Sequence, residues 1–147
     1  MQRKMIRIQH FTRELFAKQI NLSKCVEMST GQTHARHGSG SYWTSLHPAE
    51  YDKQAIAENN YDSNGSMQSR LINMGKLDWV VEVKIPINDP YLQKINIEHR
   101  DIYIYKKKMN LGDFEHKIDK FENFKFIENV SDLGDYFCYL DEYFNEK

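Results

Sequence analysis

The chain is poor in the residues and runs that mark several common classes of protein. Its 147 residues include two cysteines, Cys25 and Cys138, which have neither metal-site spacing nor a disulfide framework. That usage is typical of a reducing compartment. No apolar run approaches the roughly 18 residues of a membrane span, and no apolar stretch follows the basic N-terminal residues as in a signal peptide. We therefore expect a cytoplasmic protein with no membrane contact.

The chain also lacks the commonest cofactor and metal motifs. It contains neither a P-loop pattern nor a dinucleotide fingerprint after a predicted strand. His34, His37 and His47 lie close together in the sequence. No cysteine or helical His-x-x-x-His accompanies them, so we expect no metal. A catalytic cysteine–histidine pair is an even weaker candidate than a metal site, because neither cysteine lies in an evident polar segment.

The composition is that of one globular domain rich in aromatic side chains. Hydrophobic residues make up 40%, charged residues 28% and aromatic residues 13%, with nine tyrosines. We expect a single domain over residues 1–147, with a core at about 5–128. Residues 1–108 hold 16 Lys and Arg against 11 Asp and Glu, whereas residues 109–147 hold 4 against 10. The basic part suits an anionic ligand such as a dinucleotide, or an anionic macromolecule. The acidic part is either a solvated helix face or a mimic of a phosphate partner.

Several strands and scattered short helices predict an α+β fold. Alternation of apolar and polar residues, or high strand propensity, favours strands over 5–10, 25–28, 41–45, 78–85, 101–105 and an edge strand at 121–128. Helical spacing and start signals favour helices over 13–20, 48–58, 67–74 and 131–146, with Thr12 capping the first and Pro48 opening the second. The last is an amphipathic, acidic C-terminal helix, and residues 29–41 have loop composition. The lysines at 106–108 either contact phosphate or form a solvated strand end.

The most informative segment runs from Arg36 to Ser45, with the sequence Arg-His-Gly-Ser-Gly-Ser-Tyr-Trp-Thr-Ser. Gly38 and Gly40 suit a sharp bend or a close approach of the backbone to another group. The aromatic and hydroxyl residues that follow favour a strand. A hairpin turn before a core strand is one interpretation. The other is a loop that presents Tyr42 as a flat wall for an aromatic ligand.

Three segments in this order resemble the ADP-ribosyltransferases of the diphtheria-toxin and poly(ADP-ribose) polymerase type. They are His10-Phe11-Thr12, then Gly38-Ser39-Gly40-Ser41-Tyr42-Trp43-Thr44, then the strand opened by Asp101. The family carries a His, a Tyr and a late acidic residue on separate strands. The segment Ala35–Thr44 is similar to the bacterial subgroup with a His-Tyr-Asp signature, which is common in toxin domains. Phe11 stands where the family has Gly or Tyr, and Ser45 where many members have Asp.

The resemblance implies a split β-sheet core with short flanking helices, and a site that binds NAD as substrate. Tyr42 would stack on the nicotinamide ring, and Tyr51, on the next predicted helix, would close its other face. His10 would bond a ribose hydroxyl, with Thr12 nearby. The backbone of Phe11 would hold the nicotinamide amide, and Gly40 would let the loop deliver Tyr42 beside the ring.

By the same resemblance, Asp101 would bind the nicotinamide ribose and stabilise the charge that develops as the glycosidic bond breaks. Asp78 and Glu82, on another predicted strand, are the alternative acids. Arg36 and His37 would contact the pyrophosphate or simply belong to a solvated loop. The implied function is mono-ADP-ribosylation of a protein or nucleic-acid target, as in a toxin with a neutralising partner protein. NAD glycohydrolase activity and a catalytically inactive interaction module are the alternatives.

Overall fold

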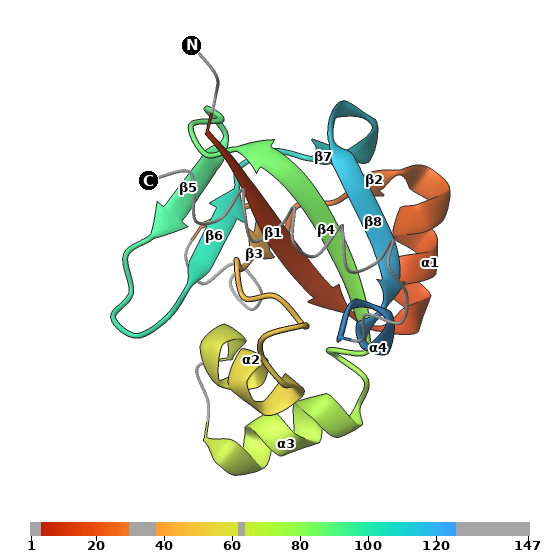
Figure 1. The fold of residues 1–147 in the computed structure, drawn as a ribbon, viewed down its shortest axis with the longest axis vertical. Helices are drawn as coiled ribbons and strands as arrows, with labels where there is room; N and C mark the ends of the chain where they lie inside the picture. The colour runs from red at the N-terminus through yellow and green to blue at the C-terminus, as the bar shows by residue number, and fades with distance from the viewer. Residues whose placement is uncertain (1–3, 30–37, 62–63, 126–147) are drawn as a thin grey trace.

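The computed structural model describes residues 4–29, 38–61 and 64–125, which form small antiparallel sheets with a few short helices. The α+β class expected from the sequence is confirmed at this level. The first sheet has the order β1 (Met5–Thr12), β4 (Trp79–Pro86), β8 (Glu115–Lys120). The second has the order β3 (Ser41–Trp43), β6 (Ile102–Tyr105), β5 (Leu92–Ile95), and β2 (Cys25–Val26) pairs with β7 (Met109–Asn110) (Figure 1).

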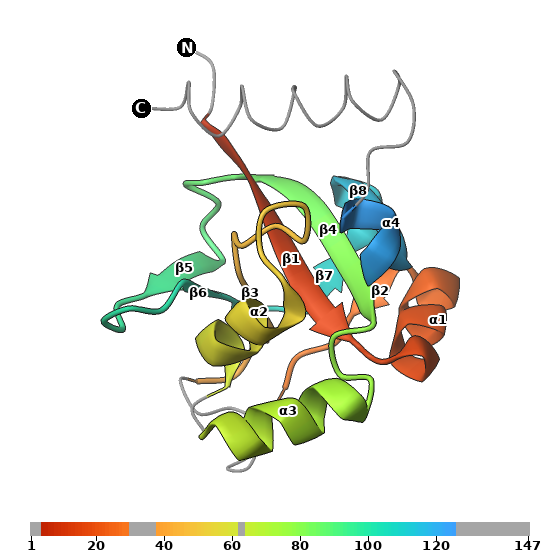
Figure 2. The same ribbon diagram turned by 60° about the horizontal axis from the view of Figure 1, so that its bottom comes forward.

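The helices lie around the sheets rather than between parallel strands. They are α1 (Glu14–Ser23), α2 (Lys53–Asn60), α3 (Gly65–Asn73) and α4 (Phe121–Lys125), with a 3₁₀ turn η1 at Leu111–Asp113. α2 and α3 pack on each other beyond one end of the strands, while α1 lies beside β8 (Figures 1 and 2). The C-terminal helix predicted over 131–146 falls outside the described residues.

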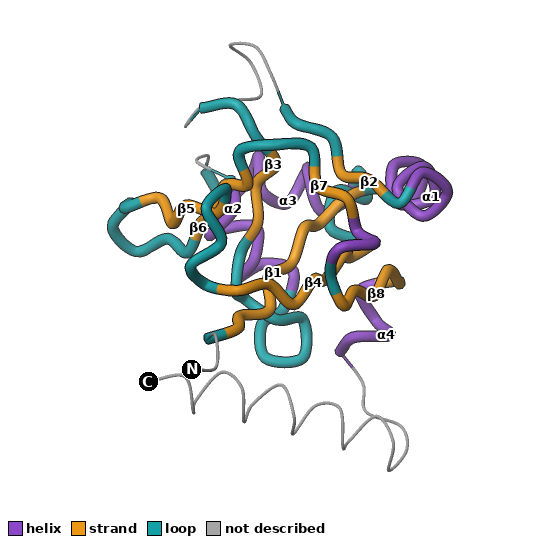
Figure 3. Tube along the Cα trace, turned by 90° about the horizontal axis from the view of Figure 1, so that it is seen from above, coloured by secondary structure: helices purple, strands orange, loops and turns teal. Residues whose placement is uncertain are grey.

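The two three-stranded sheets meet at a single bridge in the described part of the chain. Gln9 of β1 and Thr44, just after β3, exchange two backbone hydrogen bonds of 2.7 and 2.9 Å. β1 pairs along its whole length with β4, and β3 pairs with β6. The bridge lies just beyond the C-terminal end of β3, and β3 itself pairs with β6; Figure 3 shows these strands from above. The polypeptide thus forms a sheet that splits between β1 and β3.

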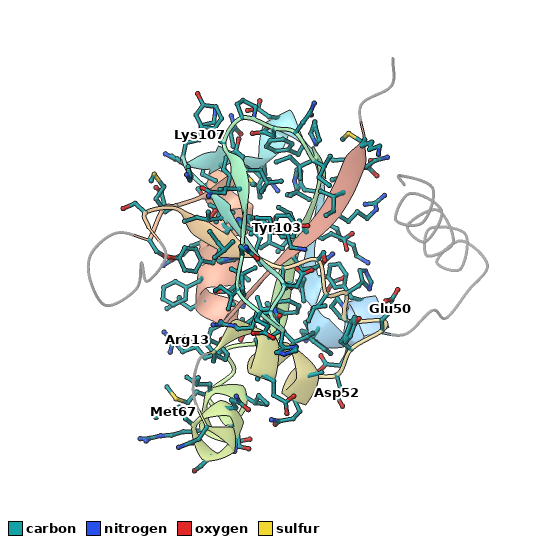
Figure 4. All side chains as sticks on the ribbon, turned by 90° about the vertical axis from the view of Figure 1, so that its left-hand side faces the viewer. Arg13, Glu50, Asp52, Met67, Tyr103 and Lys107 are labelled. Atoms are coloured by element: carbon teal, nitrogen blue, oxygen red, sulfur yellow. The ribbon has the colours of Figure 1, made fainter. Side chains whose placement is uncertain are left out.

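Two apolar clusters lie on the two faces of the β1–β4 pair. The larger one includes Ile8, Trp43, Val81 and Tyr105, and the smaller one includes Val80 and Phe121. Figure 4 shows Tyr103 of β6 in the interior, between Lys107 at one end of the molecule and Met67 at the other. Because neighbouring strand residues point to opposite faces, Val80 and Val81 reach different clusters. The two clusters hold the split sheet against α2 and α4 on one side and β6 and β7 on the other.

Some element boundaries differ from those expected, each for a local reason. Thr12 is not a helix cap, because it pairs with Trp79 as the last residue of β1, and the N-cap of α1 is Arg13. Pro48 lies in a turn, and α2 begins only at Lys53, where the Asp52 side chain accepts a 2.8 Å hydrogen bond from the Ala55 N–H.

The edge strand expected at 121–128 is wrong over its described part. Residues 121–125 form α4, which places Phe121 and Phe124, three residues apart, in the smaller apolar cluster together. The neighbouring strand β8 was not predicted, since Glu115–Lys120 holds only one aliphatic residue, Ile118, packed against the core. The short strands β5 and β7 were also missed, while β2 ends at Val26 rather than at residue 28.

Candidate functional site

The candidate site lies where β1 and β3 part. Since the N–H and C=O of Gln9 bond to Thr44, these groups point to the β3 side of β1. Backbone groups alternate sides along an antiparallel strand. Those of His10 therefore point to β4, and those of Phe11 point to the β3 side again. Continuing the register would set Phe11 opposite Tyr42, yet neither backbone group of Phe11 has a partner among residues 4–29, 38–61 and 64–125. One donor and one acceptor thus face the split together.

His10 joins the first and second motifs across this split. Its Nδ1 lies 2.8 Å from the carbonyl oxygen of Tyr42, and its ring lies 5.2 Å from that of Trp43. A carbonyl can only accept, so Nδ1 carries the proton and Nε2 keeps its lone pair. Burial lowers the pKa of His10 below its usual 6.5, an effect that the bond to Tyr42 partly opposes. The ring is therefore a neutral acceptor at pH 7.

This lowered pKa predicts a pH dependence of folding. Below pH 6.5 the unfolded chain binds a proton at His10 that the folded chain resists, so acidification destabilises the fold from pH 6.5 down to the folded-state pKa. The slope contributed by this group is at most about 1.4 kcal/mol per pH unit. Urea unfolding of His10→Gln between pH 5 and 7.5 should lack that contribution. A His99→Gln control, which changes an exposed ring, should keep it. Parallel profiles for His10→Gln and the parent would contradict the prediction.

Tyr42 is held in place at both its backbone and its hydroxyl. The hydroxyl donates a 2.9 Å hydrogen bond to the carbonyl of Gly38, and the backbone pairs with Ile104 of β6. Ser29 anchors the preceding turn by exchanging two backbone hydrogen bonds with Gly40, of 2.8 and 3.2 Å. The half-buried ring is thus fixed on a short strand rather than on a free loop, as a flat binding wall requires.

Gly40 has a packing reason to be glycine. Its φ is +155°, and a Cβ there would lie 2.5 Å from the Tyr105 carbonyl oxygen and 2.6 Å from Cγ1 of Ile104. Both distances are too short for a real side chain, and one contact is with backbone. The close approach is therefore between β6 and the turn that carries Tyr42.

Gly40→Ala is expected to lower the free energy of unfolding by about 3 kcal/mol, because the turn must move away from β6. Urea denaturation measures this loss. Gly65→Ala is the matched control, since a Cβ at this first position of α3 meets nothing within 4 Å. That change should be neutral or mildly stabilising. Equal stabilities for the two variants would rule out the packing explanation.

Asp101 immediately precedes β6, and its carboxylate binds residues that follow Tyr42. Oδ1 accepts hydrogen bonds from the Ser45 N–H at 2.7 Å and the Thr44 hydroxyl at 3.1 Å, while Oδ2 accepts one from the Ser45 hydroxyl at 2.6 Å. A carboxylate has about four acceptor positions. Within the described residues, these contacts fill both acceptor positions of Oδ1 and one of Oδ2, so one acceptor position of Oδ2 is left. Ser45 supplies two of the three donors.

The two alternative acids lie elsewhere. Glu82 is buried and bonds to Gln9 Nε2 at 2.7 Å and His47 Nε2 at 3.1 Å. Gln9 and His10 are consecutive in β1, so Glu82 lies on the sheet face opposite the His10 ring. Asp78 precedes β4 and pairs with Lys53 Nζ at 2.8 Å. Asp101 alone of the three holds a residue next to the Tyr42 motif.

The other residues expected at the site differ in where the structure places them. Tyr51 is 40% exposed and lies in the turn before α2, not on that helix as expected. Thr12 is buried at the end of β1. The ring of Phe11 turns away from the split to pack near Phe121, with 6.1 Å between ring centroids, so only its backbone faces β3. Arg36 lies outside the described residues, as do His34 and His37.

Comparison with known proteins identified no relative of this chain. No family model, curated protein or solved structure matches the chain. Within the described ranges, no group of three or more His, Cys, Asp or Glu could hold a metal ion. No helix in the same ranges has the length and apolar character needed to cross a membrane. The geometry between β1 and β3 is therefore the basis for a functional proposal.

Proposed function

We propose that the chain is a mono-ADP-ribosyltransferase that uses NAD and releases nicotinamide. The observation that carries the proposal is the split after the Gln9–Thr44 bridge, which leaves the N–H and C=O of Phe11 facing the Tyr42 strand. A carboxamide offers one acceptor and two donors. The nicotinamide amide can therefore bond both backbone groups of Phe11 while its ring stacks on Tyr42.

The residues around the split suit the rest of the reaction. The lone pair on His10 Nε2 can accept a hydrogen bond from one ribose hydroxyl, and the remaining acceptor position on Asp101 Oδ2 can accept one from a second ribose hydroxyl. When the bond between C1′ and the nicotinamide nitrogen breaks, its electron pair neutralises the positive ring and leaves an oxocarbenium ion on the ribose. The Asp101 carboxylate stabilises that charge, which is greatest in the transition state. A nucleophilic oxygen or nitrogen of the target then bonds to C1′ and loses its proton to solvent.

The test uses NAD labelled in its ADP-ribose part, with nicotinamide release measured in parallel. The full chain is incubated with the label and with cell extract as a source of targets. Label on protein or nucleic acid, together with free nicotinamide, supports the transferase. Nicotinamide and free ADP-ribose without labelled macromolecules identify an NAD glycohydrolase using the same site. Neither product, with no NAD binding by calorimetry, rejects both.

One observation favours a second candidate, a catalytically inactive interaction module. The Asp101 carboxylate already makes three hydrogen bonds inside the protein, which is how a purely structural Asp behaves. This alternative predicts that Tyr42→Ala and Asp101→Ala leave the effect of the protein on its host cell intact. A growth defect caused by the parent chain and lost in both variants would exclude the module.

A further inference from the structure

Asn59, the second-last residue of α2, is joined to the residues just before β6 by a reciprocal set of hydrogen bonds. The Asn59 side chain accepts from the Asp101 N–H at 2.6 Å and donates to the Asp101 C=O at 2.9 Å. In return, the Arg100 guanidinium donates to the backbone carbonyls of Asn59 at 2.6 Å and Asn60 at 2.9 Å. Four bonds therefore fix Arg100 and Asp101 to the C-terminus of α2.

Asparagine is the side chain that this position requires. Its amide presents a donor and an acceptor side by side, so it pairs with the backbone N–H and C=O of a single residue, as a residue on a neighbouring antiparallel strand would. The Asn59 side chain is buried, and its Nδ2 also lies 3.2 Å from the Thr44 hydroxyl, which in turn donates to Asp101 Oδ1. The amide thus touches both the backbone of Asp101 and a group that holds its carboxylate. An Asp at position 59 would keep the acceptor but lose the donor, and would set a carboxylate oxygen against the Asp101 carbonyl.

We propose that Asn59 is a positioning residue for Asp101, so that α2 determines where the carboxylate of the acid points. This inference rests on the proposed function, because it concerns the same site. Asn59 itself touches no substrate in this scheme. It acts by holding the backbone N–H and C=O of Asp101, while Arg100 holds the end of α2 that carries Asn59. Asp101 and Arg100 lie 42 and 41 positions after Asn59 in the sequence.

The experiment measures kcat and KM for nicotinamide release from labelled NAD by the full chain and its Asn59→Asp variant. We expect kcat to fall about 10–100-fold while KM for NAD changes less than about 2-fold, since misplacing the acid weakens transition-state binding more than ground-state binding. Arg100→Lys, which keeps the charge but not the paired donors, is the second variant. It should lower kcat in the same direction by a smaller factor, and it covers the case in which Asn59→Asp fails to fold.

Two controls separate positioning from stability. Asn64→Ala removes the side chain that caps α3 through the Met67 N–H, at 2.9 Å, so it destabilises the neighbouring helix without reaching Asp101. Its kcat should equal that of the parent. In an Asp101→Asn background, Asn59→Asp should add no further loss of residual turnover, because the group that it positions is already gone.

The outcomes distinguish this inference from the proposed function. A parent chain that turns over NAD, with Asn59→Asp and Arg100→Lys both at the parental kcat, overturns the role of Asn59 alone. A full additional loss in the Asp101→Asn background does the same. A parent chain that neither binds NAD nor releases nicotinamide overturns the proposed function, and the positioning role with it.

Discussion

Replacing Glu82 with alanine is expected to lower the free energy of unfolding by about 3–5 kcal/mol, the largest stability loss anticipated for a single side chain here. The carboxylate is buried between Gln9 and His47, and Arg7 Nη1 lies 3.5 Å from it. His47 Nδ1 accepts from the Ala49 N–H at 3.0 Å, so its Nε2 carries the proton that Glu82 binds. Removing Glu82 leaves buried donors facing a void, which costs far more than the contact itself gains.

Urea denaturation at pH 7 measures this loss, and Glu115→Ala is the matched control. Glu115 is a second carboxylate near Arg7, at 3.6 Å, but its side chain is 66% exposed. Its removal should change stability by less than about 1 kcal/mol. The stability loss of Glu82→Gln should lie between those of Glu82→Ala and Glu115→Ala, because the amide fills the space of the carboxylate but lacks its charge. A loss as small as that of Glu115→Ala would mean that the buried network contributes little.

The same network predicts how acid destabilises the protein. Burial alone would raise the pKa of Glu82, but the hydrogen bond and electrostatic attraction of His47, the hydrogen bond from Gln9 and the charge of Arg7 together outweigh it and hold the pKa below the usual 4.5. A lowered folded-state pKa gives stability that is present above pH 4.5 and is lost as pH falls through the folded value. Parent and Glu82→Gln stabilities should therefore converge below pH 4.5.

The sequence predicts well those elements whose residues alternate strongly. β1, β4 and β6 were expected because their apolar residues recur at every second position or run continuously through a buried strand. β8 gave no such signal, since it is an edge strand with charged residues on both faces. α4 shows the opposite problem, where phenylalanines at 121 and 124 fit a helix or a loose strand until their common burial in one cluster is known.

Some residues of the candidate site could be predicted from the sequence and others could not. His10, Tyr42 and Asp101 were named from motifs, and the structure links the first to the Tyr42 carbonyl and the third to Ser45. Asn59 and Arg100 were missed, because an asparagine at a helix end and an arginine before a strand are common residues with no local pattern. Their importance comes only from the pairing of segments far apart in the chain. The sequence placed Glu82 in the correct strand, but it could not show which face of the sheet the side chain occupies, because that became clear only from its hydrogen bond to Gln9.

Asp101→Asn is expected to lower kcat for nicotinamide release by about 10²–10³-fold, the largest effect on the proposed activity. The substitution removes the negative charge that would stabilise the oxocarbenium ion. It also turns an amide NH₂ either toward the Ser45 hydroxyl, which must then rotate to accept, or toward the Thr44 hydroxyl and the Ser45 N–H, where the N–H loses its acceptor. Stability should fall by about 1–3 kcal/mol for the same reason. NAD affinity should change far less, because Phe11 and Tyr42 still hold the nicotinamide.

Parallel variants of the other acids make this prediction specific. Asp89→Asn applies the same chemical change at a turn where the carboxylate accepts a 2.8 Å hydrogen bond from the Tyr91 N–H, and it should retain full turnover. Asp78→Asn and Glu82→Gln, measured per folded molecule, should retain turnover as well. The Glu82 carboxylate is engaged with Gln9 and His47, and that of Asp78 with Lys53, so neither binds the Tyr42 segment as Asp101 does. A loss of 10²-fold or more in either of these two, with activity kept in Asp101→Asn, would transfer the role of the acid to that residue, because charge stabilisation requires the carboxylate to face the ribose.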